Sequence, residues 1–385
     1  MKMKTILQYT LCILTLLSLP PLSGAAEERG APSTKNDGAS PSPEAAVREL
    51  MEKGNLEEAA SLLDKIEGND YAISCFKGII ALKRGNPKEA IAHFQRAAEI
   101  DGSRPELHLF LSQAYHEIGD ERKTLAALVK GEAAGKTHAS YYLFRGRVEM
   151  SLDAYESAHD TLLEGLDRFP SESGFLRELA VVLIRAGLYA AAVEYAGAYN
   201  EKAPADKEGV LVIAHALREA GRPREAATVL EEAVLRHSED PKIAAALGHT
   251  YGQARKHHAA GRFAEKAALR DPAHAFDAAE HYMSAGDWKK ASEMNLLVAD
   301  RQKRLSQRLS LYVRQNRFER AAVIGEQMKK ERLLDDRDRY CLIFAYVQLG
   351  RLDKAASSAQ AIETPKWRAM TATLLHDDSP ETTFR

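Results

Sequence analysis

Residues 244–272 read AAALGHTYGQARKHHAAGRFAEKAALRDP and contain one complete unit of a pattern that runs through the chain. Glycine stands at position 248 and alanine at position 260, where small side chains let one helix pack closely against another. Arg255 lies between them at the expected turn, and Pro272 ends the second helical stretch. The segment therefore predicts two short helices joined by a turn.

The turn position recurs along the chain at successive spacings of 31, 34, 34, 34, 34, 34, 31, 30 and 34 residues. Most of these positions are glycine, which readily adopts the left-handed conformation that ends many helices. Asp and Asn tolerate that conformation better than most other residues, so Arg255 is the one departure. The ten positions are Gly54, Gly85, Gly119, Asp153, Gly187, Gly221, Arg255, Gly286, Asn316 and Gly350.

Small residues also recur at two fixed distances from the turn position. Five residues after it the chain has alanine, or threonine once: Ala59, Ala90, Thr124, Ala158, Ala192, Ala226, Ala260, Ala291, Ala321 and Ala355. Seven residues before it a second small residue recurs, with three exceptions (Val47, Leu309 and Ile343): Gly78, Ser112, Gly146, Ala180, Ala214, Gly248 and Ala279. Apolar residues between these sites follow the helical spacing i, i+3, i+4, i+7. The chain is therefore predicted to be all-α, with about ten helix–turn–helix units.

This arrangement resembles the tetratricopeptide repeat (TPR), a family with a 34-residue helix–turn–helix unit. The quoted segment has Ala244 and Ala264 where that family has bulkier residues, and it matches the signature at Leu247, Gly248, Tyr251, Ala260, Ala267 and Pro272. The resemblance covers roughly residues 40–369 in ten repeats. It implies an α-solenoid wound as a right-handed superhelix, whose first helices line a concave, partner-binding groove.

The N-terminus has the pattern of a secretory signal. Lys2 and Lys4 precede an apolar run at Ile6–Leu19, and Ser23 and Ala25 stand at positions typical of cleavage. The alternative is a retained anchor, although the run is shorter than the roughly 20 residues that a spanning helix needs. We expect cleavage of residues 1–25 and a periplasmic or secreted mature chain that does not span a membrane.

The remaining boundaries follow from composition. Residues 26–43 are rich in Pro, Gly and Ser and are predicted to be a flexible linker. The repeats are expected over residues 44–369. Residues 366–375 are expected to form a capping helix with Trp367, Met370 and Leu374 on one face. Residues 376–385 are predicted to be a disordered tail.

Catalytic signatures are missing from the sequence. It has no phosphate-binding Gly-rich loop with Lys-Ser/Thr, no Gly-x-Ser-x-Gly and no His-Glu-x-x-His. Cys75 and Cys341 are expected to be buried free thiols. With 53 Lys+Arg against 55 Asp+Glu, the net charge of −2 argues against a broadly basic nucleic-acid binder. We therefore predict a non-enzyme without cofactor, metal or nucleic acid.

Two repeated residue types invite other interpretations. His215 and His249 are 34 residues apart, so two imidazoles could approach one ion, but no third ligand is evident. A row of tyrosines could stack on bases or sugars, but this position normally packs within the repeat. We therefore expect core packing for Tyr115, Tyr251, Tyr282, Tyr312 and Tyr346.

The resemblance places partner contacts on the first helices, at the second, fifth, ninth, twelfth and thirteenth positions of each repeat. In repeats four to seven those positions hold an excess of cations over two acids, Glu208 and Glu219. The predicted partner-binding residues are Arg147, Arg177, Arg185, His215, Arg218, Lys242 and His249. Arginine suits carboxylates because its planar fork of donors matches them.

These features predict a protein-interaction scaffold of the bacterial cell envelope that binds an extended, acidic partner segment. By analogy with exported proteins of this family, it would serve pilus or exopolysaccharide assembly. An ordinary solvated helix face is the alternative explanation of the local charge. A second function left open is direct binding of an acidic polysaccharide by the same groove, and a third is an enzyme with an unrecognised site in repeats eight to ten.

Overall fold

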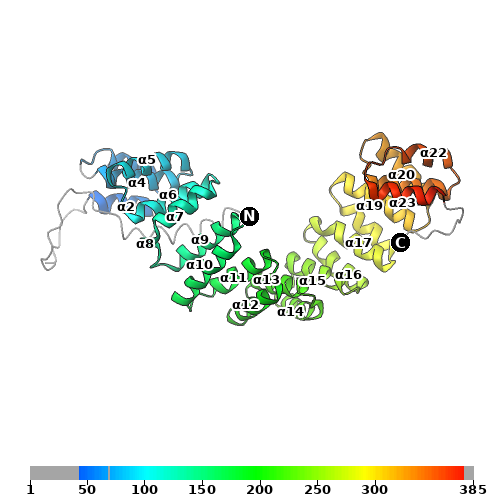
Figure 1. The fold of residues 1–385 in the computed structure, drawn as a ribbon, viewed down its shortest axis with the longest axis horizontal. Coiled ribbons are helices and arrows are strands. Elements are labelled where there is room, and N and C mark those ends of the chain that lie inside the picture. Colours follow the sequence, from blue (N-terminus) through cyan, green and yellow to red (C-terminus); the bar gives the residue numbers. More distant parts are fainter. Residues whose placement is uncertain (1–42, 68–69, 377–385) are drawn as a thin grey trace. The chain divides into compact units, whose positions relative to one another are not determined.

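The computed structural model describes residues 43–67 and 70–376, and every regular element in those ranges is a helix (Figure 1). The all-α prediction is therefore confirmed. The predicted signal (1–25), nearly all of the predicted linker (26–43) and residues 377–385 of the predicted tail lie outside the described residues. No helix within the described ranges is long and apolar enough to cross a membrane.

The chain divides into two compact units, Met1–Tyr195 and Ala196–Arg385, each a stack of helical hairpins. Unit 1 contains α2 (Pro43–Glu52), α3 (Leu56–Leu63), α4 (Asp70–Lys83), α5 (Pro87–Asp101), α6 (Pro105–Glu117), α7 (Glu121–Lys130), α8 (Glu132–Gly135), α9 (Ala139–Ser151), α10 (Tyr155–Arg168), α11 (Gly174–Arg185) and the start of α12 (Tyr189–Lys202). Unit 2 continues with α13 (Lys207–Glu219), α14 (Pro223–Arg236), α15 (Pro241–Gln253), α16 (His257–Ala268), the 3-10 turn η2 (Pro272–His274), α17 (Ala275–Ala285), α18 (Trp288–Leu297), α19 (Arg301–Arg314), α20 (Phe318–Lys330), α21 (Asp336–Gln348), α22 (Leu352–Ala359) and α23 (Pro365–His376).

All ten predicted turn positions have a positive φ. The seven glycines lie between 68° and 82°, and the three other residues are Asp153 at 58°, Arg255 at 57° and Asn316 at 55°. Arg255 therefore adopts the left-handed conformation despite its Cβ. Outside this set, Arg332, two residues beyond α20, also has a positive φ of 58°.

The small residues mark where the two helices of a repeat touch. All ten members of the alanine/threonine set are 0 % exposed. A Cβ built on Gly248 would lie 3.0 Å from the backbone nitrogen of Ala264 and 3.1 Å from the carbonyl oxygen of Ala260, so the two small sites of this repeat meet directly. A Cβ on Gly78 would lie 2.4 Å from the ring of Phe94. Side chains at these sites set how closely the helices approach.

The polar members of the two sets are satisfied within their own helices. The Thr124 hydroxyl donates to the carbonyl oxygen of Asp120 at 2.9 Å, and the Ser112 hydroxyl donates to that of Leu109 at 2.7 Å. Each bond lies within one helical turn, so burying these hydroxyls leaves no unpaired donor.

The apolar core is distributed along the chain. Buried side chains of unit 1 form one cluster from Val47 to Ala127 and another from Leu128 to Val182. Those of unit 2 form three, spanning Val210–Leu247, Ala264–Leu311 and Leu305–Leu374. Each cluster is made by helices that are neighbours in sequence, as expected for repeats that bury their faces on one another.

The C-terminal helix α23 differs from the prediction on one point. Trp367 packs against the last core cluster and Leu374 is buried, as expected. Met370, however, is 39 % exposed, and Thr371 is buried in its place. The buried stripe therefore follows i, i+4 and i+7 from Trp367, a spacing that leaves Met370 outside the contact.

Arg255 offers a test of the turn geometry. We expect Arg255→Gly to raise the free energy of unfolding by about 0.5–1 kcal/mol, because glycine lacks the Cβ that disfavours the left-handed conformation. Gly221→Ala is the matched reverse change and should lower it by about 1 kcal/mol. A Cβ on Gly221 meets nothing within 4 Å, so its cost is that of the backbone alone. Urea unfolding followed by circular dichroism measures both. A loss of stability in Arg255→Gly would contradict this explanation.

Asp338 is a carboxylate buried between α19 and α21. It is 1 % exposed, accepts a hydrogen bond from the Ser306 hydroxyl, and leaves its Oδ2 without a partner. Burial raises the pKa of Asp338 to about 6. The folded state therefore holds this proton more tightly than the unfolded chain, and stability falls as pH rises from about 4 through about 6.

We expect Asp338→Asn to raise the free energy of unfolding by about 2 kcal/mol at about pH 7.5, and to change it little at about pH 4, where Asp338 is already neutral. Asp336→Asn is the control with the opposite sign. Hydrogen bonds from Thr364 lower the pKa of Asp336, so its charged form is favoured in the fold. Thermal unfolding at both pH values checks the pair. An equal effect of Asp338→Asn at both pH values would rule out a titration of Asp338.

Candidate functional site: the first-helix faces

The predicted cations of unit 1 lie on two adjacent first helices. Arg147 belongs to α9, and Arg177 and Arg185 belong to α11. An acid that the sequence analysis did not single out, Glu178, lies between the two helices and is 7 % exposed. Its Oε1 accepts from Nη2 of Arg147 at 2.6 Å and from Nη2 of Arg177 at 3.1 Å. One carboxylate thus holds two of the three arginines.

Arg185 is different. Its side chain is exposed at the C-terminal end of α11, and it makes no ion pair with the described residues. The charge excess on this face is therefore smaller than the sequence count implied. Glu178 occupies the sixth position of its repeat, outside the five positions that the family resemblance assigns to the ligand. Its proximity to Arg177 in the sequence was the available signal.

The predicted cations of unit 2 lie on α13 and α15. Nη2 of Arg218 donates to Nδ1 of His215 at 3.0 Å, and burial lowers the pKa of Arg218. The guanidinium is half-buried, and its Nε has no hydrogen-bond partner. Lys242 reaches back from α15 to Glu208 of α13, with an Nζ–Oε1 distance of 3.4 Å. Arg218 is therefore a half-buried cation held by an imidazole, and Lys242 is already paired.

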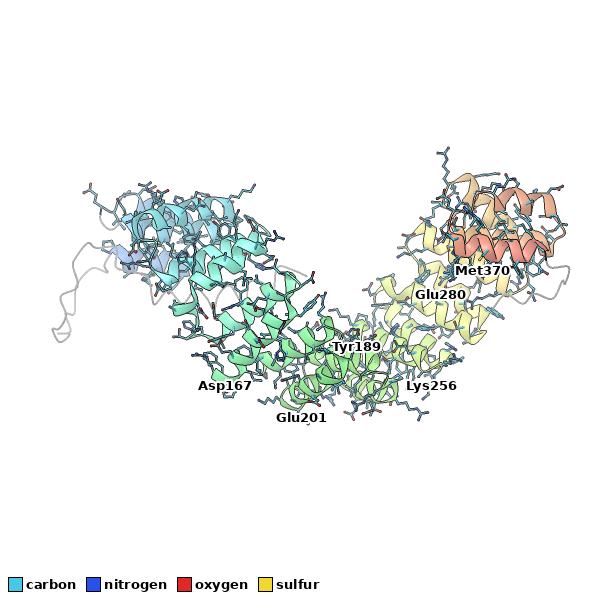
Figure 2. The ribbon with its side chains drawn as sticks, viewed as in Figure 1. Asp167, Tyr189, Glu201, Lys256, Glu280 and Met370 are labelled. Carbon is cyan, nitrogen blue, oxygen red and sulfur yellow. The ribbon has the colours of Figure 1, made fainter. Side chains whose placement is uncertain are left out.

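A third histidine extends this face. His281 of α17 packs over Gly252 of α15, where a Cβ would come within 2.5 Å of the imidazole. The sequence analysis did not select His281, because it stands at the tenth position of its repeat, outside the positions that the family resemblance assigns to the ligand. Glu280, labelled in Figure 2, takes the equivalent of the His249 position instead.

The three histidines of this face share one electrostatic environment. Burial is the main cause that lowers the pKa of each: His215, His249 and His281. The positive charge of Arg218 lowers the pKa of His215 and His249 further. Two acids act in the opposite direction: Glu219 raises the pKa of His215 and His249, and Asp277 raises that of His249 and His281. Within residues 43–67 and 70–376, no three His, Cys, Asp or Glu side chains are arranged to hold a metal ion.

The other sequence candidates belong to the packing. Tyr282 and Tyr346 are buried as predicted, whereas Tyr115, Tyr251 and Tyr312 are half-buried. The hydroxyls of Tyr251, Tyr282 and Tyr346 donate to carboxylates on second helices, namely Glu231, Glu265 and Glu326. These tyrosines therefore tie helices together.

Cys75 and Cys341 are buried free thiols, as predicted. Burial raises the pKa of Cys75 to about 11 and that of Cys341 to about 12, so both stay protonated at neutral pH.

The repeats have counterparts in known proteins. One tetratricopeptide-repeat family model matches residues 44–105 and 138–207, and a second matches residues 212–232. Similar structures include the C-terminal part of a TPR repeat-containing protein from Cytophaga hutchinsonii, with a TM-score of 0.50, 13% identity and coverage of 59% of this chain and 96% of that one. A tetratricopeptide repeat protein from Parabacteroides merdae gives 0.46 and 17%, covering 62% and 96%. None of the curated proteins compared is a significant match.

The histidine environment is directly measurable. Following the Cε1–H signals from about pH 5 to about pH 8 should give midpoints below the ordinary value near 6.5 for His215, His249 and His281. Arg218→Gln should raise the pKa of His215 and His249, because it removes a neighbouring positive charge. Asp277→Asn should lower the pKa of His249 and His281. Unchanged midpoints in both variants would show that these groups do not face one another.

Proposed function

This chain is a tetratricopeptide-repeat protein, and we propose that it is a non-enzymatic scaffold of the bacterial cell envelope that binds an extended acidic segment of a partner. The fold supports protein–protein interaction, because stacked helix pairs present a long surface formed by many repeats. TPR proteins are generally non-catalytic scaffolds. The finer parts of the proposal rest on the charges of the two faces and on the N-terminal sequence.

The proposal of an acidic partner depends on the ion pairing and burial of Arg185 and Arg218. Arg185 makes no ion pair with a described residue, and Arg218 is half-buried against an imidazole, with one nitrogen unpartnered. Glu219 attracts Arg218 electrostatically but forms no direct ion pair with it. A half-buried guanidinium without a directly bound carboxylate is costly, and a carboxylate ligand would offset that cost. Glu178 already neutralises part of the charge of Arg147 and Arg177. These two arginines therefore attract an acidic ligand less strongly than Arg185 and Arg218 do.

The envelope location rests on the N-terminal pattern: Lys2 and Lys4, the apolar run at Ile6–Leu19, and the small residues before position 26. We propose a periplasmic or secreted protein that acts in pilus or exopolysaccharide assembly. A repeat scaffold suits such a role because its extended surface can hold several components.

The test reverses three arginines. We expect Arg177→Glu, Arg185→Glu and Arg218→Glu together to leave the helical circular dichroism unchanged and to abolish capture of the partner from envelope extract. The physical reason is that an acidic segment then meets like charge on both faces. The measurement is affinity purification of the mature chain followed by mass spectrometry.

A matched control variant makes the same change of charge, three basic residues to Glu, on second helices. Lys130 of α7 and Arg262 and Lys266 of α16 are exposed and make no ion pair with the described residues. Changing these three to Glu should leave capture intact. Equal capture by the first-helix variant and by the native chain would refute the acidic-partner proposal. Retention of an acidic polysaccharide in place of a protein, lost at high salt, would favour the alternative function.

A further inference from the structure

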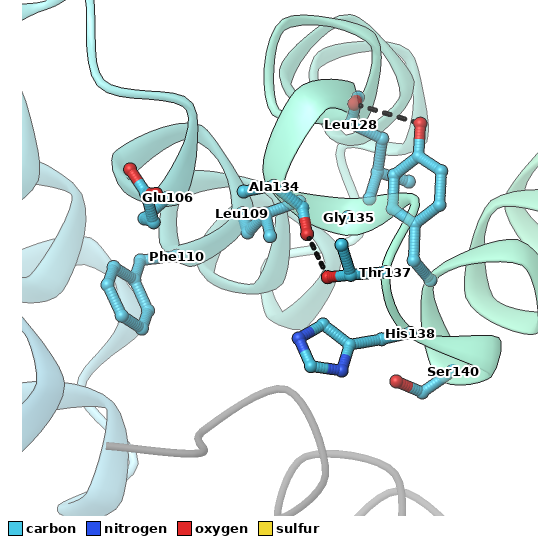
Figure 3. Close-up of a pocket in the computed structure, with 10 residues that line it drawn as sticks. Glu106, Leu109, Phe110, Leu128, Ala134, Gly135, Thr137, His138 and Ser140 are labelled. Atoms are coloured by element: carbon cyan, nitrogen blue, oxygen red, sulfur yellow. Dashed lines mark hydrogen bonds between the residues drawn. The ribbon is translucent and has the colours of Figure 1, made fainter. Parts of the chain in front are cut away.

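Unit 1 contains a pocket of 270 Å³ between α6, the α7–α8 region and the start of α9 (Figure 3). It lies beside the first-helix positions of repeats three and four, apart from the arginines described above. Its lining residues are Glu106, Leu109, Phe110, Leu128, Ala134, Gly135, Thr137, His138, Ser140 and Tyr141.

The pocket exists because the second helix of this repeat is broken. The neighbouring second helices α5 and α10 have 15 and 14 residues, whereas α7 has 10 and is followed by the single turn α8. Two glycines hold the break in place. A Cβ on Gly131 would lie 2.6 Å from Leu109, and one on Gly135 would lie 2.2 Å from the Tyr141 ring. Close packing on both sides of α8 therefore fixes the opening.

The pocket has an apolar part, beside which two hydroxyls are hydrogen-bonded within the chain. Leu109, Phe110, Leu128 and Ala134 supply aliphatic and aromatic surface. The Thr137 hydroxyl donates to the carbonyl oxygen of Ala134 at 2.9 Å, and the Tyr141 hydroxyl donates to that of Leu128 at 3.3 Å (Figure 3). These two bonds engage the Thr137 and Tyr141 hydroxyls, so the polar groups that remain for a ligand are those of Glu106, His138 and Ser140.

One charged lining residue forms no direct ion pair with the described residues. Glu106 is half-buried and makes no ion pair with the described residues. The nearby Arg104 is engaged elsewhere: its Nε donates to Asp101 at 2.8 Å, and its guanidinium stacks over Tyr71 at 4.7 Å. The exposed side chain of His138 also lines the pocket and makes no hydrogen bond with the described residues. Arg104 attracts Glu106 electrostatically but forms its direct contacts with Asp101 and Tyr71, so the Glu106 carboxylate can still accept a cation from outside.

We propose that this pocket binds one apolar side chain of a partner polypeptide, of leucine or phenylalanine size, and that Glu106 binds a Lys or Arg adjacent to it in the partner. The pocket is smaller than the roughly 300–1,000 Å³ of sites that hold small molecules, so a single side chain suits it better than a cofactor. The charge of Glu106 selects a basic neighbour. This inference rests on the proposed scaffold function and adds an apolar anchor to it.

The test uses methyl NMR of the full chain with short peptides as probes. N-acetyl-leucyl-lysine amide should shift the methyl signals of Leu109, Leu128 and Ala134. N-acetyl-alanyl-lysine amide should bind at least roughly tenfold more weakly, because burying one aliphatic side chain is worth about that factor. N-acetyl-leucyl-glutamate amide should also bind more weakly, because its carboxylate meets Glu106. No shift with the leucyl-lysine probe, or equal binding of all three peptides, would overturn the proposal.

Variants separate the two parts of the site. Ala134→Met fills the pocket and should abolish the shifts. Ala133→Met is its control, since Ala133 is an exposed residue of the same turn that does not line the pocket. Glu106→Gln should keep leucine binding and lose the preference for lysine over glutamate. Thermal unfolding and the methyl spectrum show whether each variant is folded. Binding that survives Ala134→Met in a folded chain would overturn the pocket assignment.

The same titration distinguishes this proposal from the proposed function. The Arg177→Glu, Arg185→Glu, Arg218→Glu variant should bind the leucyl-lysine probe as the native chain does, because none of the three arginines lines the pocket. If that variant still captures the partner, the acidic-segment proposal fails while the pocket result stands. If the native chain does not bind the probe, the pocket fails independently of the arginines.

Discussion

The contact between the two helices of each repeat is the constraint on which the rest of the structure depends. It requires a small residue after the turn, fully buried in all ten repeats, and a second small residue recurs on the preceding helix in seven of them. Where both are small, as at Gly248 and Ala260, backbone meets backbone. The left-handed turn between them returns the chain at the angle that this contact needs. A larger side chain at the buried position after the turn would force the two helices apart.

Because each repeat packs on its neighbours alone, the energetics are local. The five core clusters each draw on helices that are adjacent in sequence. A substitution in one repeat therefore changes the stability mainly of that repeat and of the repeats packed against it. The fold also tolerates departures that a single central core would amplify, such as the left-handed Arg255 or the buried carboxylate of Asp338. Each is a local cost in a structure whose other repeats are unaffected.

The charges on the first-helix faces show that the net charge of the chain does not predict the local charge of a binding surface. The whole chain is near neutrality, yet Arg185 and Arg218 form no direct ion pair with a described carboxylate, while Arg147 and Arg177 share one. The pocket at the broken helix α7–α8 adds a second kind of recognition, apolar and next to an acid. A partner with an acidic stretch and a separate apolar–basic pair would use both. Such a combination gives a repeat scaffold selectivity that charge alone cannot.

The sequence by itself determined the repeat length, the helix–turn–helix unit, the turn positions and the small contacts. These features depend on the backbone preferences and side-chain sizes of residues close together in the chain, so a periodic pattern reports them directly. The tertiary structure decided which charges are neutralised, because Glu178 meets Arg147 only when α9 and α11 pack side by side. It also placed His281 beside His249, exposed Met370, and opened the pocket beside Gly131 and Gly135. Those outcomes depend on side-chain directions across neighbouring helices, which shift whenever a repeat is shortened or a helix is broken.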